Sequence, residues 1–311
     1  MVALYIPLIV GRVVLKLPVR VTIELTNFCN LHCVFCPRRF MEKETGFMAP
    51  GLAYKITDEL HSWISAGHRV AVVPFFRGET LTHPQWDVLL ADIRDKGLGP
   101  IQMATNASLL TEERAHRLLE IGVDTLSFSM DTVDPDIYKR VRGGDYVISL
   151  SNVLRFLELR QAYSGEGGCR IVQVSAVDSA LTHEGIPAFI DYWRDKIDRL
   201  RVYPEHSADG HTGSLPSGNV DKVRVSCRKV REEMVIYWNG SVALCNHDWT
   251  RMRTGQEIGN VSERSLEEIW RSNAYETIRK AHETGSLQGI IPCEHCGHWG
   301  SQAVGLVLGK V

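Results

Sequence analysis

The chain has 311 residues, which is enough for one large domain or two of moderate size around a substantial core. Its 35 Lys and Arg nearly balance its 37 Asp and Glu, and no block of like charge stands out, which argues against a nucleic acid as the main partner. Eight cysteines without a secretory signal favour metal binding in a reducing, cytoplasmic compartment over disulfide bonds.

The first ten residues are apolar, but they do not predict a membrane segment. The run is too short to span a bilayer, contains Pro7, and is followed by Gly11 and Arg12. No basic stretch precedes it and no small-residue cleavage site follows it, so a secretory signal is not expected. We interpret residues 1–19 as a lead-in that packs on the first domain.

From residue 20 to about residue 205, short β-rich segments alternate with amphipathic helical segments. Strands are expected at 20–25, 69–76, 100–104, 125–130, 170–177 and 200–203. Helices are expected at 52–66, 85–96, 112–121, 148–163 and 186–196. Thr111 followed by two acidic residues is a typical helix start. Six β/α repeats predict an α/β fold, with a parallel sheet covered by helices.

Three cysteines follow the first expected strand with the spacing C-x3-C-x2-C, at Cys29, Cys33 and Cys36. Three thiolates from one short loop can hold three irons of a [4Fe–4S] cluster and leave the fourth iron open to a small molecule. The alternatives are a zinc knuckle, a disulfide pair, or buried thiols that pack as small hydrophobes. Zinc usually binds two C-x2-C pairs, so the x3 gap favours the cluster.

The chain changes character after about residue 205. Residues 206–219 are rich in Gly, Ser and Pro and read as a linker. Two alternating runs, 233–238 and 241–245, flank Asn239-Gly240, which predicts a hairpin with a type I′ turn. A Ser-x-x-Glu capping box at Ser265 opens a helix expected to run to residue 282.

A second set of cysteines lies in this C-terminal part, at Cys227, Cys245, Cys293 and Cys296. One precedes the hairpin, one ends it, and the last two form a C-x2-C knuckle. Four thiolates make a closed site, which suits either Zn²⁺ or a fully ligated [4Fe–4S] cluster. The chemistry of the residues leaves these two possibilities open.

The cysteine loop, with its flanking residues 24–39, resembles the signature of the radical S-adenosylmethionine (SAM) enzymes. The resemblance implies a partial (β/α)6 TIM-like barrel over residues 20–205, with the catalytic groups at the C-terminal ends of the strands. It also implies that the open iron binds the amino and carboxylate groups of SAM, which an electron from the cluster cleaves to a 5′-deoxyadenosyl radical.

The C-terminal run resembles the twitch form of the SPASM extension found in that superfamily. This resemblance implies that residues 206–311 form a small iron–sulfur domain of a β-hairpin and a helix. At the second cysteine set, this resemblance favours an auxiliary [4Fe–4S] cluster over Zn²⁺. The implied cofactors are therefore SAM and two [4Fe–4S] clusters.

The resemblance also implies contacts with SAM. Gly78 and Glu79 occupy the Gly-Glu motif after the second strand, where the acid binds the SAM ammonium. The other implied contacts are Phe35, Asn106, Ser129 and Asp131. Arg77 and Thr80 depart from the usual motif, and each strand-end residue taken singly could equally serve an ordinary turn. The fifth strand lacks the glycine-containing adenine motif of many relatives.

Three further residues are candidates for catalysis because they fall at expected strand ends. Arg77, Asp178 and Glu205 could deprotonate or bind the substrate, although solvated loop positions are the default for such residues. Cys169 lies outside both cysteine sets, at the start of a strand, which is the wrong end of a barrel for chemistry.

The cysteine spacing most resembles that of twitch-type dehydrogenases of aminocyclitol and aminoglycoside pathways, such as those that oxidise 2-deoxy-scyllo-inosamine. This implies oxidation of a carbinol of a small molecule to a ketone, with a flavodoxin- or ferredoxin-type electron donor. The alternatives are a sugar epimerase that needs a thiol donor, a peptide-modifying enzyme, and a non-catalytic iron–sulfur or zinc protein.

Overall fold

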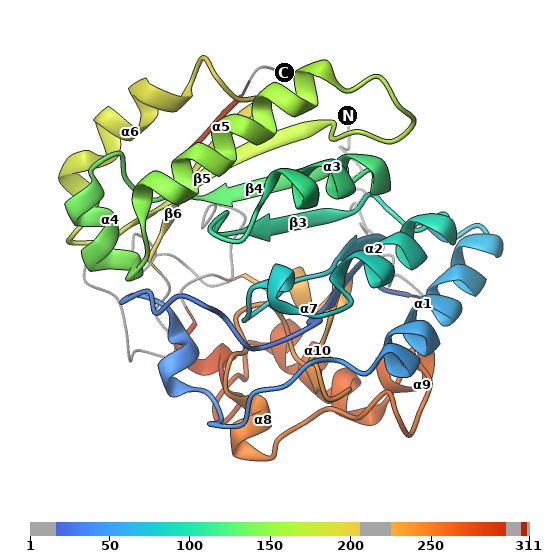
Figure 1. Ribbon diagram of the computed structural model, residues 1–311. Helices are drawn as coiled ribbons and strands as arrows, with labels where there is room; N and C mark the ends of the chain where they lie inside the picture. The colour runs from blue at the N-terminus through green and yellow to red at the C-terminus, as the bar shows by residue number, and fades with distance from the viewer. Residues whose placement is uncertain (1–16, 206–224, 297–305, 310–311) are drawn as a thin grey trace, which may run out of the picture.

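The computed structural model describes residues 17–205, 225–296 and 306–309. Its strands form two sheets, with the orders β2-β1-β7-β8 and β3-β4-β5-β6-β9 (Figure 1). The strands are β1 (Arg20–Ile23), β2 (Ala71–Val73), β3 (Gln102–Thr105), β4 (Thr125–Ser129), β5 (Ile171–Asp178), β6 (Arg199–Pro204), β7 (Glu233–Ile236), β8 (Val242–Ala243) and β9 (Val307–Gly309).

Helices cover the outside of these sheets. Neighbours α1 and α2, α2 and α3, and α3 and α5 are in contact, and Figure 1 shows them following one another along the outer side. The helices are α1 (Pro50–Ser65), α2 (Trp86–Asp95), α3 (Glu112–Ile121), α4 (Pro135–Arg142), α5 (Tyr146–Ala162), α6 (Ile186–Trp193), α7 (Lys229–Glu232), α8 (Arg251–Thr254), α9 (Leu266–Trp270) and α10 (Asn273–Thr284).

The predicted partial barrel is confirmed. Strands β1 and β2 pair in parallel, as do β3 to β6, and a parallel bridge between Val72 and Ile101 joins the two sheets. All six expected strands therefore exist, each within two or three residues of the expected ends. The hairpin of the C-terminal part joins the same architecture, because β7 pairs in parallel with β1.

Apolar and polar residues alternate along the strands, and this alternation explains which side chains point toward the helices and which point into the barrel. In β4, Leu126 and Phe128 are fully buried, and Phe128 packs against Phe156 of α5. The alternate residues Ser127 and Ser129 are half-buried and face the other side. Polar groups pair there, since Gln173 of β5 donates to the Ser127 hydroxyl over 2.9 Å. The barrel is therefore apolar toward its helices and polar inside.

The hairpin is confirmed, but the predicted turn type is wrong. A type I′ turn needs positive φ at both central residues, and only Gly240 has it, with φ of 89°. The loop closes one residue earlier, through the 2.8 Å hydrogen bond from Tyr237 N to the Ser241 carbonyl. The reason is that the Trp238 N–H is engaged elsewhere, donating to the Glu24 carboxylate over 3.1 Å.

Three other features differ from the sequence-based expectation. The helix expected from residue 265 to 282 is two helices, because the Ser272 side chain caps α10 and breaks the run; the predicted capping box of Ser265 with Glu268 is present. Helix α4 was not expected, although Asp134 caps it and Pro135 occupies its first turn. Strand β9 pairs antiparallel with β6 from a distant part of the chain.

Two expectations concern residues outside those described. Most of the lead-in at 1–19 and the whole linker at 206–219 fall there. Among the helices that the structure does describe, none combines the length and apolarity that crossing a bilayer requires. The division into domains at residue 206 stays a prediction.

A pair of glycine substitutions tests the hairpin. Gly240→Ala should destabilise the protein more than Gly255→Ala, because both residues have positive φ but only a Cβ at Gly240 would lie 2.6 Å from Asn260 Oδ1. The left-handed conformation alone costs about 1–2 kcal/mol for alanine. Thermal unfolding of the two variants measures the difference, and equal midpoints would contradict the role assigned to this contact.

Candidate active site

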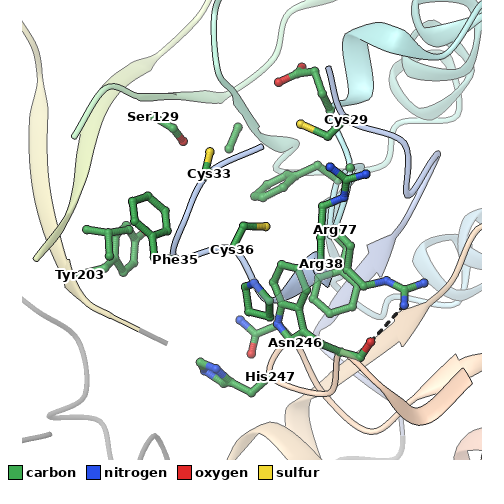
Figure 2. A pocket seen from close by; sticks show the side chains of 18 of the residues that line it. Cys29, Cys33, Phe35, Cys36, Arg38, Arg77, Ser129, Tyr203, Asn246 and His247 are labelled. Atoms are coloured by element: carbon green, nitrogen blue, oxygen red, sulfur yellow. Dashed lines mark hydrogen bonds between the residues drawn. The ribbon is translucent and has the colours of Figure 1, made fainter. Parts of the chain in front are cut away.

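A cavity of about 760 Å³ is lined by residues after the C-terminal ends of barrel strands and also by Arg20 and Glu233, which begin β1 and β7. The loop after β1 contributes Cys29, Cys33 and Cys36 to its wall, and Figure 2 shows these thiols around one side of it. Cys227, from the C-terminal part, lines the same cavity. The first cysteine set and one member of the second therefore line one space.

The cysteine loop fits an iron–sulfur cluster by its donor set. A hydrogen bond of 3.1 Å from Cys36 N to the Cys33 carbonyl forms a tight turn between two of the thiols. Burial raises the pKa of Cys33 to about 12, and the nearby Arg142 opposes this rise. Within the described ranges, no three or more His, Cys, Asp or Glu side chains already form a closed metal site, so no single-ion site is preformed.

The Gly78-Glu79 segment lies directly against the cysteine loop. A Cβ on Gly78 would lie 2.3 Å from the Thr26 carbonyl and 2.5 Å from that of Phe28, so only glycine fits there. Glu79 N then donates to the Phe28 carbonyl over 2.8 Å. This hydrogen bond holds Glu79 against the cysteine loop.

Glu79 is a buried carboxylate held by three donors. Its Oε1 accepts from Leu81 N over 3.2 Å and from the Thr105 hydroxyl over 2.9 Å, and its Oε2 accepts from Asn106 N over 2.8 Å. Burial raises the pKa of this carboxyl, and the three hydrogen bonds oppose that rise. A held acid in the cavity wall suits a cationic ligand such as an ammonium.

The other residues expected to contact SAM divide into two groups. Phe35, Asn106 and Ser129 line the cavity, and Asn106 Nδ2 also lies 4.0 Å from Cys29 Sγ. Asp131 is buried outside the lining set, where it accepts from Arg142 Nε over 2.5 Å and from Val177 N over 2.8 Å. Asp131 is therefore engaged in holding other groups.

Arg142 is a site residue that the sequence reasoning missed. It ends α4, lines the cavity, and is held there by Asp131. Its guanidinium is the main nearby charge that opposes the raised pKa of Cys33. The signal that could have found it is the Asp-Pro helix start at 134–135, which predicts α4 and so brings its last turn toward the cysteine loop.

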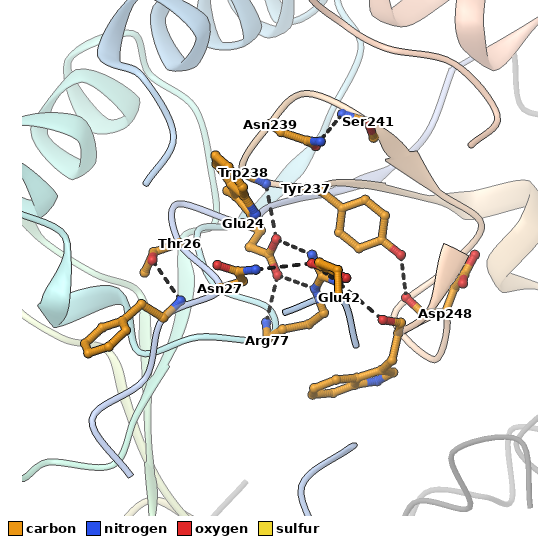
Figure 3. A network of polar contacts seen from close by, with 12 residues as sticks. Glu24, Thr26, Asn27, Glu42, Arg77, Tyr237, Trp238, Asn239, Ser241 and Asp248 are labelled. Atoms are coloured by element: carbon orange, nitrogen blue, oxygen red, sulfur yellow. Dashed lines mark hydrogen bonds and ion pairs between the residues drawn. The ribbon is translucent and has the colours of Figure 1, made fainter. Parts of the chain in front are cut away.

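Arg77 lies in a buried ion pair as well as in the cavity wall (Figure 3). Its Nε and Nη2 donate to the Glu24 carboxylate over 2.7 and 2.8 Å, and its Nη1 donates to Glu42 and to the Trp249 carbonyl. Its guanidinium also lies 3.9 Å from the centre of the Tyr237 ring. These contacts raise the Arg77 pKa further, so it is a fixed cation that joins three segments.

The two expected acids and the extra thiol lie outside the set of cavity-lining residues. Asp178 pairs with His183 over 2.8 Å at the end of β5. Glu205 follows β6 and is partly buried. Cys169 is buried before β5, with its thiol 3.4 Å from the Ile171 carbonyl, and burial raises its pKa to about 11.

The second cysteine set is gathered by the hairpin, α7 and the last turn. Cys227, Cys245 and Cys293 are buried, and Cys227 and Cys293 both add to the raised pKa of Cys245, which burial dominates. His282 Nε2 lies 3.3 Å from Cys293 Sγ. Cys296 closes the knuckle through a 3.3 Å hydrogen bond to the Cys293 carbonyl. The donor set suits a closed four-thiolate site.

Comparisons with known proteins agree with this geometry. Residues 23–164 match the radical SAM superfamily, and residues 227–297 match the SPASM iron–sulfur cluster-binding domain. A Pyrococcus furiosus protein named tungsten-containing aldehyde ferredoxin oxidoreductase cofactor-modifying protein is 26% identical over 297 residues, which cover 83% of this chain and 82% of the relative.

Two solved structures share the fold. Streptococcus suis SuiB, bound to its precursor peptide SuiA, superposes with a TM-score of 0.68 at 18% identity over 86% of this chain and 67% of SuiB. BtrN, in complex with AdoMet and 2-DOIA, superposes with a TM-score of 0.57 at 19% identity over 87% of this chain and 89% of BtrN. At these identities the likeness concerns the fold alone.

The Glu24–Arg77 pair can be tested by removing one partner and then both. Arg77→Gln should destabilise the protein by about 3–5 kcal/mol, because it leaves a buried carboxylate unpaired. The double variant Glu24→Gln/Arg77→Gln should recover most of that loss, since both sites become neutral. Chemical denaturation measures the stabilities, and cluster content after reconstitution is measured beside it. If the double variant is no more stable than Arg77→Gln, the pair is not the structural tie described here.

Proposed function

Because the chain carries a radical SAM domain followed by a SPASM-type iron–sulfur domain, with SAM and [4Fe–4S] clusters as its cofactors, we propose that it is an oxidoreductase that converts a carbinol of a small aminocyclitol or aminosugar to a ketone. The observation that carries this proposal is the cavity lined by the first cysteine set and by Cys227 of the second. We place the substrate in that cavity.

When bound, SAM and its cluster supply a 5′-deoxyadenosyl radical that removes a hydrogen atom, and the auxiliary cluster supplies an acceptor for the remaining electron. The protein's own groups hold the reactants. Glu79 offers a carboxylate to the SAM ammonium, and Ser129 lines the wall nearby. Arg142, held by Asp131, offers a guanidinium to a carboxylate.

Oxidation of a carbinol also releases the hydroxyl proton, which needs an acceptor. Glu233, at the start of β7, lines the cavity, and its buried Oε2 accepts no hydrogen bond among the described residues, although Lys229 Nζ lies 3.9 Å from it. Asp178 and Glu205 stand at the ends of their strands, outside the cavity lining. We therefore assign proton acceptance to Glu233 in preference to them.

The thiol-dependent epimerase alternative loses its support from Cys169. That thiol is buried before the start of β5, outside the set of cavity-lining residues, and interacts with a backbone carbonyl. The other seven cysteines belong to the two sets that suit clusters. An electron acceptor within reach of the substrate favours oxidation over return of a hydrogen atom.

A second candidate function is the modification of an enzyme cofactor. The similarity to the Pyrococcus furiosus protein, whose name states that role, extends over most of both chains and favours it. The same radical chemistry would then act on a different small molecule. In either case the first electron is proposed to come from a flavodoxin- or ferredoxin-type protein.

Anaerobic reconstitution tests the cofactor requirement. We expect about eight irons and no zinc per chain, since each [4Fe–4S] cluster holds four irons. Addition of SAM and dithionite should then yield 5′-deoxyadenosine, measured by liquid chromatography. With 2-deoxy-scyllo-inosamine or a related aminocyclitol, ketone and 5′-deoxyadenosine should form in equal amounts. A zinc-containing protein that yields no 5′-deoxyadenosine would overturn the proposal.

Two cysteine variants separate oxidation from epimerisation. Cys245→Ala should lower the iron content by about four per chain, keep SAM cleavage, and lose ketone formation. Cys169→Ala is the matched control, and its ketone formation should equal that of the wild type. A stalled Cys169→Ala variant whose SAM cleavage persists would instead support the epimerase.

A further inference from the structure

Three arginines that line the cavity form no ion pair with a described acid: Arg38 on the cysteine loop, and Arg20 and Arg201 on barrel strands. Arg20, at the start of β1, donates to the neutral Gln102 side chain over 2.7 Å. Arg201, in β6, lies 4.5 Å from the centre of the Tyr203 ring. Among the described residues, neither guanidinium has a carboxylate within ion-pair distance, and the buried Nε of Arg201 has no hydrogen-bond partner.

Arg38 donates to the Leu31 carbonyl beside the cysteine loop, and four other cationic side chains of the cavity wall are paired with acids. Each is paired with an acid from its own neighbourhood: Arg77 with Glu24, Arg142 with Asp131, Arg228 with Glu232 over 2.8 Å, and Lys229 with Glu233 over 3.9 Å. Glu232, which also lines the cavity, is thus engaged by Arg228, whereas Lys229 lies beyond hydrogen-bond distance of Glu233. Arg20 and Arg201 have no such ion pair among the described residues, and Glu233 offsets the charge of Arg20 only in part.

Unpaired cations in a partly buried wall favour an anionic ligand. Both guanidinium groups line the same cavity, and the charge of Arg201 adds to burial in lowering the pKa of Arg20. Glu233 lies opposite Arg20 in the β1–β7 register and partly offsets its charge. A guanidinium fork binds the oxygens of a phosphate or carboxylate in a bidentate manner.

We propose that Arg20 and Arg201 form an oxyanion subsite that binds a phosphate or carboxylate group of the substrate. The subsite rests on the proposed function, because it takes this cavity as the place where the substrate lies. It narrows the substrate class to molecules that carry an oxyanion as well as the carbon that loses hydrogen. Glu233, beside the subsite, would meet a hydroxyl or ammonium of the same molecule.

The test is direct binding of two small probes to the anaerobically reconstituted full chain. Inorganic pyrophosphate and malonate are titrated separately by calorimetry at fixed ionic strength, against Arg20→Gln, Arg201→Gln and Arg201→Lys. Arg253→Gln, on the exposed face of α8, is the matched control. Each glutamine variant should bind the preferred probe about tenfold more weakly, the typical loss of one charge-assisted contact. Arg201→Lys should retain part of the affinity, and Arg253→Gln all of it.

The probes also identify the group. Tighter binding of pyrophosphate assigns a phosphate, and tighter binding of malonate assigns a carboxylate. The proposal is overturned if neither probe binds the wild type, or if both glutamine variants bind as the wild type does while retaining its iron content and unfolding temperature.

SAM affinity, measured in parallel, should be equal in all variants. Probe binding that persists in a protein unable to form 5′-deoxyadenosine would refute the proposed function and leave the subsite standing. SAM cleavage without probe binding would refute the subsite and leave the proposed function standing.

Discussion

The carboxylate of Glu24 is the constraint on which the rest of the site depends. It is fully buried at the end of β1 and accepts from Arg77 Nε, Nη2 and backbone N, and from Trp238 N. One acid thereby ties the first barrel strand to the loop after β2 and to the hairpin of the C-terminal part. A buried charge with this many donors has no low-energy alternative, because any shift of one segment leaves a charged group without its partners.

This tie determines where the chemistry can take place. Arg77 immediately precedes Gly78 and Glu79, which lie on the carbonyls of the cysteine loop, so the same pair that holds the hairpin also holds the acid above the thiols. The hairpin in turn carries Cys245, while Cys227 precedes it and faces the cavity. Both cysteine sets thus keep fixed positions relative to one space. The contacts of the buried Glu24 carboxylate hold the hairpin of the C-terminal part in place against the barrel.

The sequence predicts the parts of this arrangement that depend on local pattern. Strand alternation, cysteine spacing and the Ser265 capping box are all local, and each is present as expected. The turn at Asn239-Gly240 differs because Trp238 N donates to Glu24, a residue 214 positions away. The sequence does not predict Arg142 as a site residue for a similar reason, since its place beside Cys33 depends on a tertiary ion pair with Asp131. Side-chain type indicates which residues reach a strand end, but the partner that each one finds depends on the folded chain.

The two ends of the cavity differ in how far their charged groups are paired within the protein. Around the cysteine loop, nearly every charged group is already satisfied: Glu79 by three donors, Arg142 by Asp131, and Arg77 by Glu24. A wall of that kind is preorganised, because its groups need no rearrangement when a ligand of fixed structure binds. Arg20 and Arg201 differ from these groups, because neither forms an ion pair with a described acid and Glu233 offsets the charge of Arg20 only in part. A negatively charged ligand gains the most binding energy near Arg20 and Arg201. The protein's own ion pairs therefore organise the cofactor side of the cavity, and the unpaired arginines determine which ligand the substrate side favours.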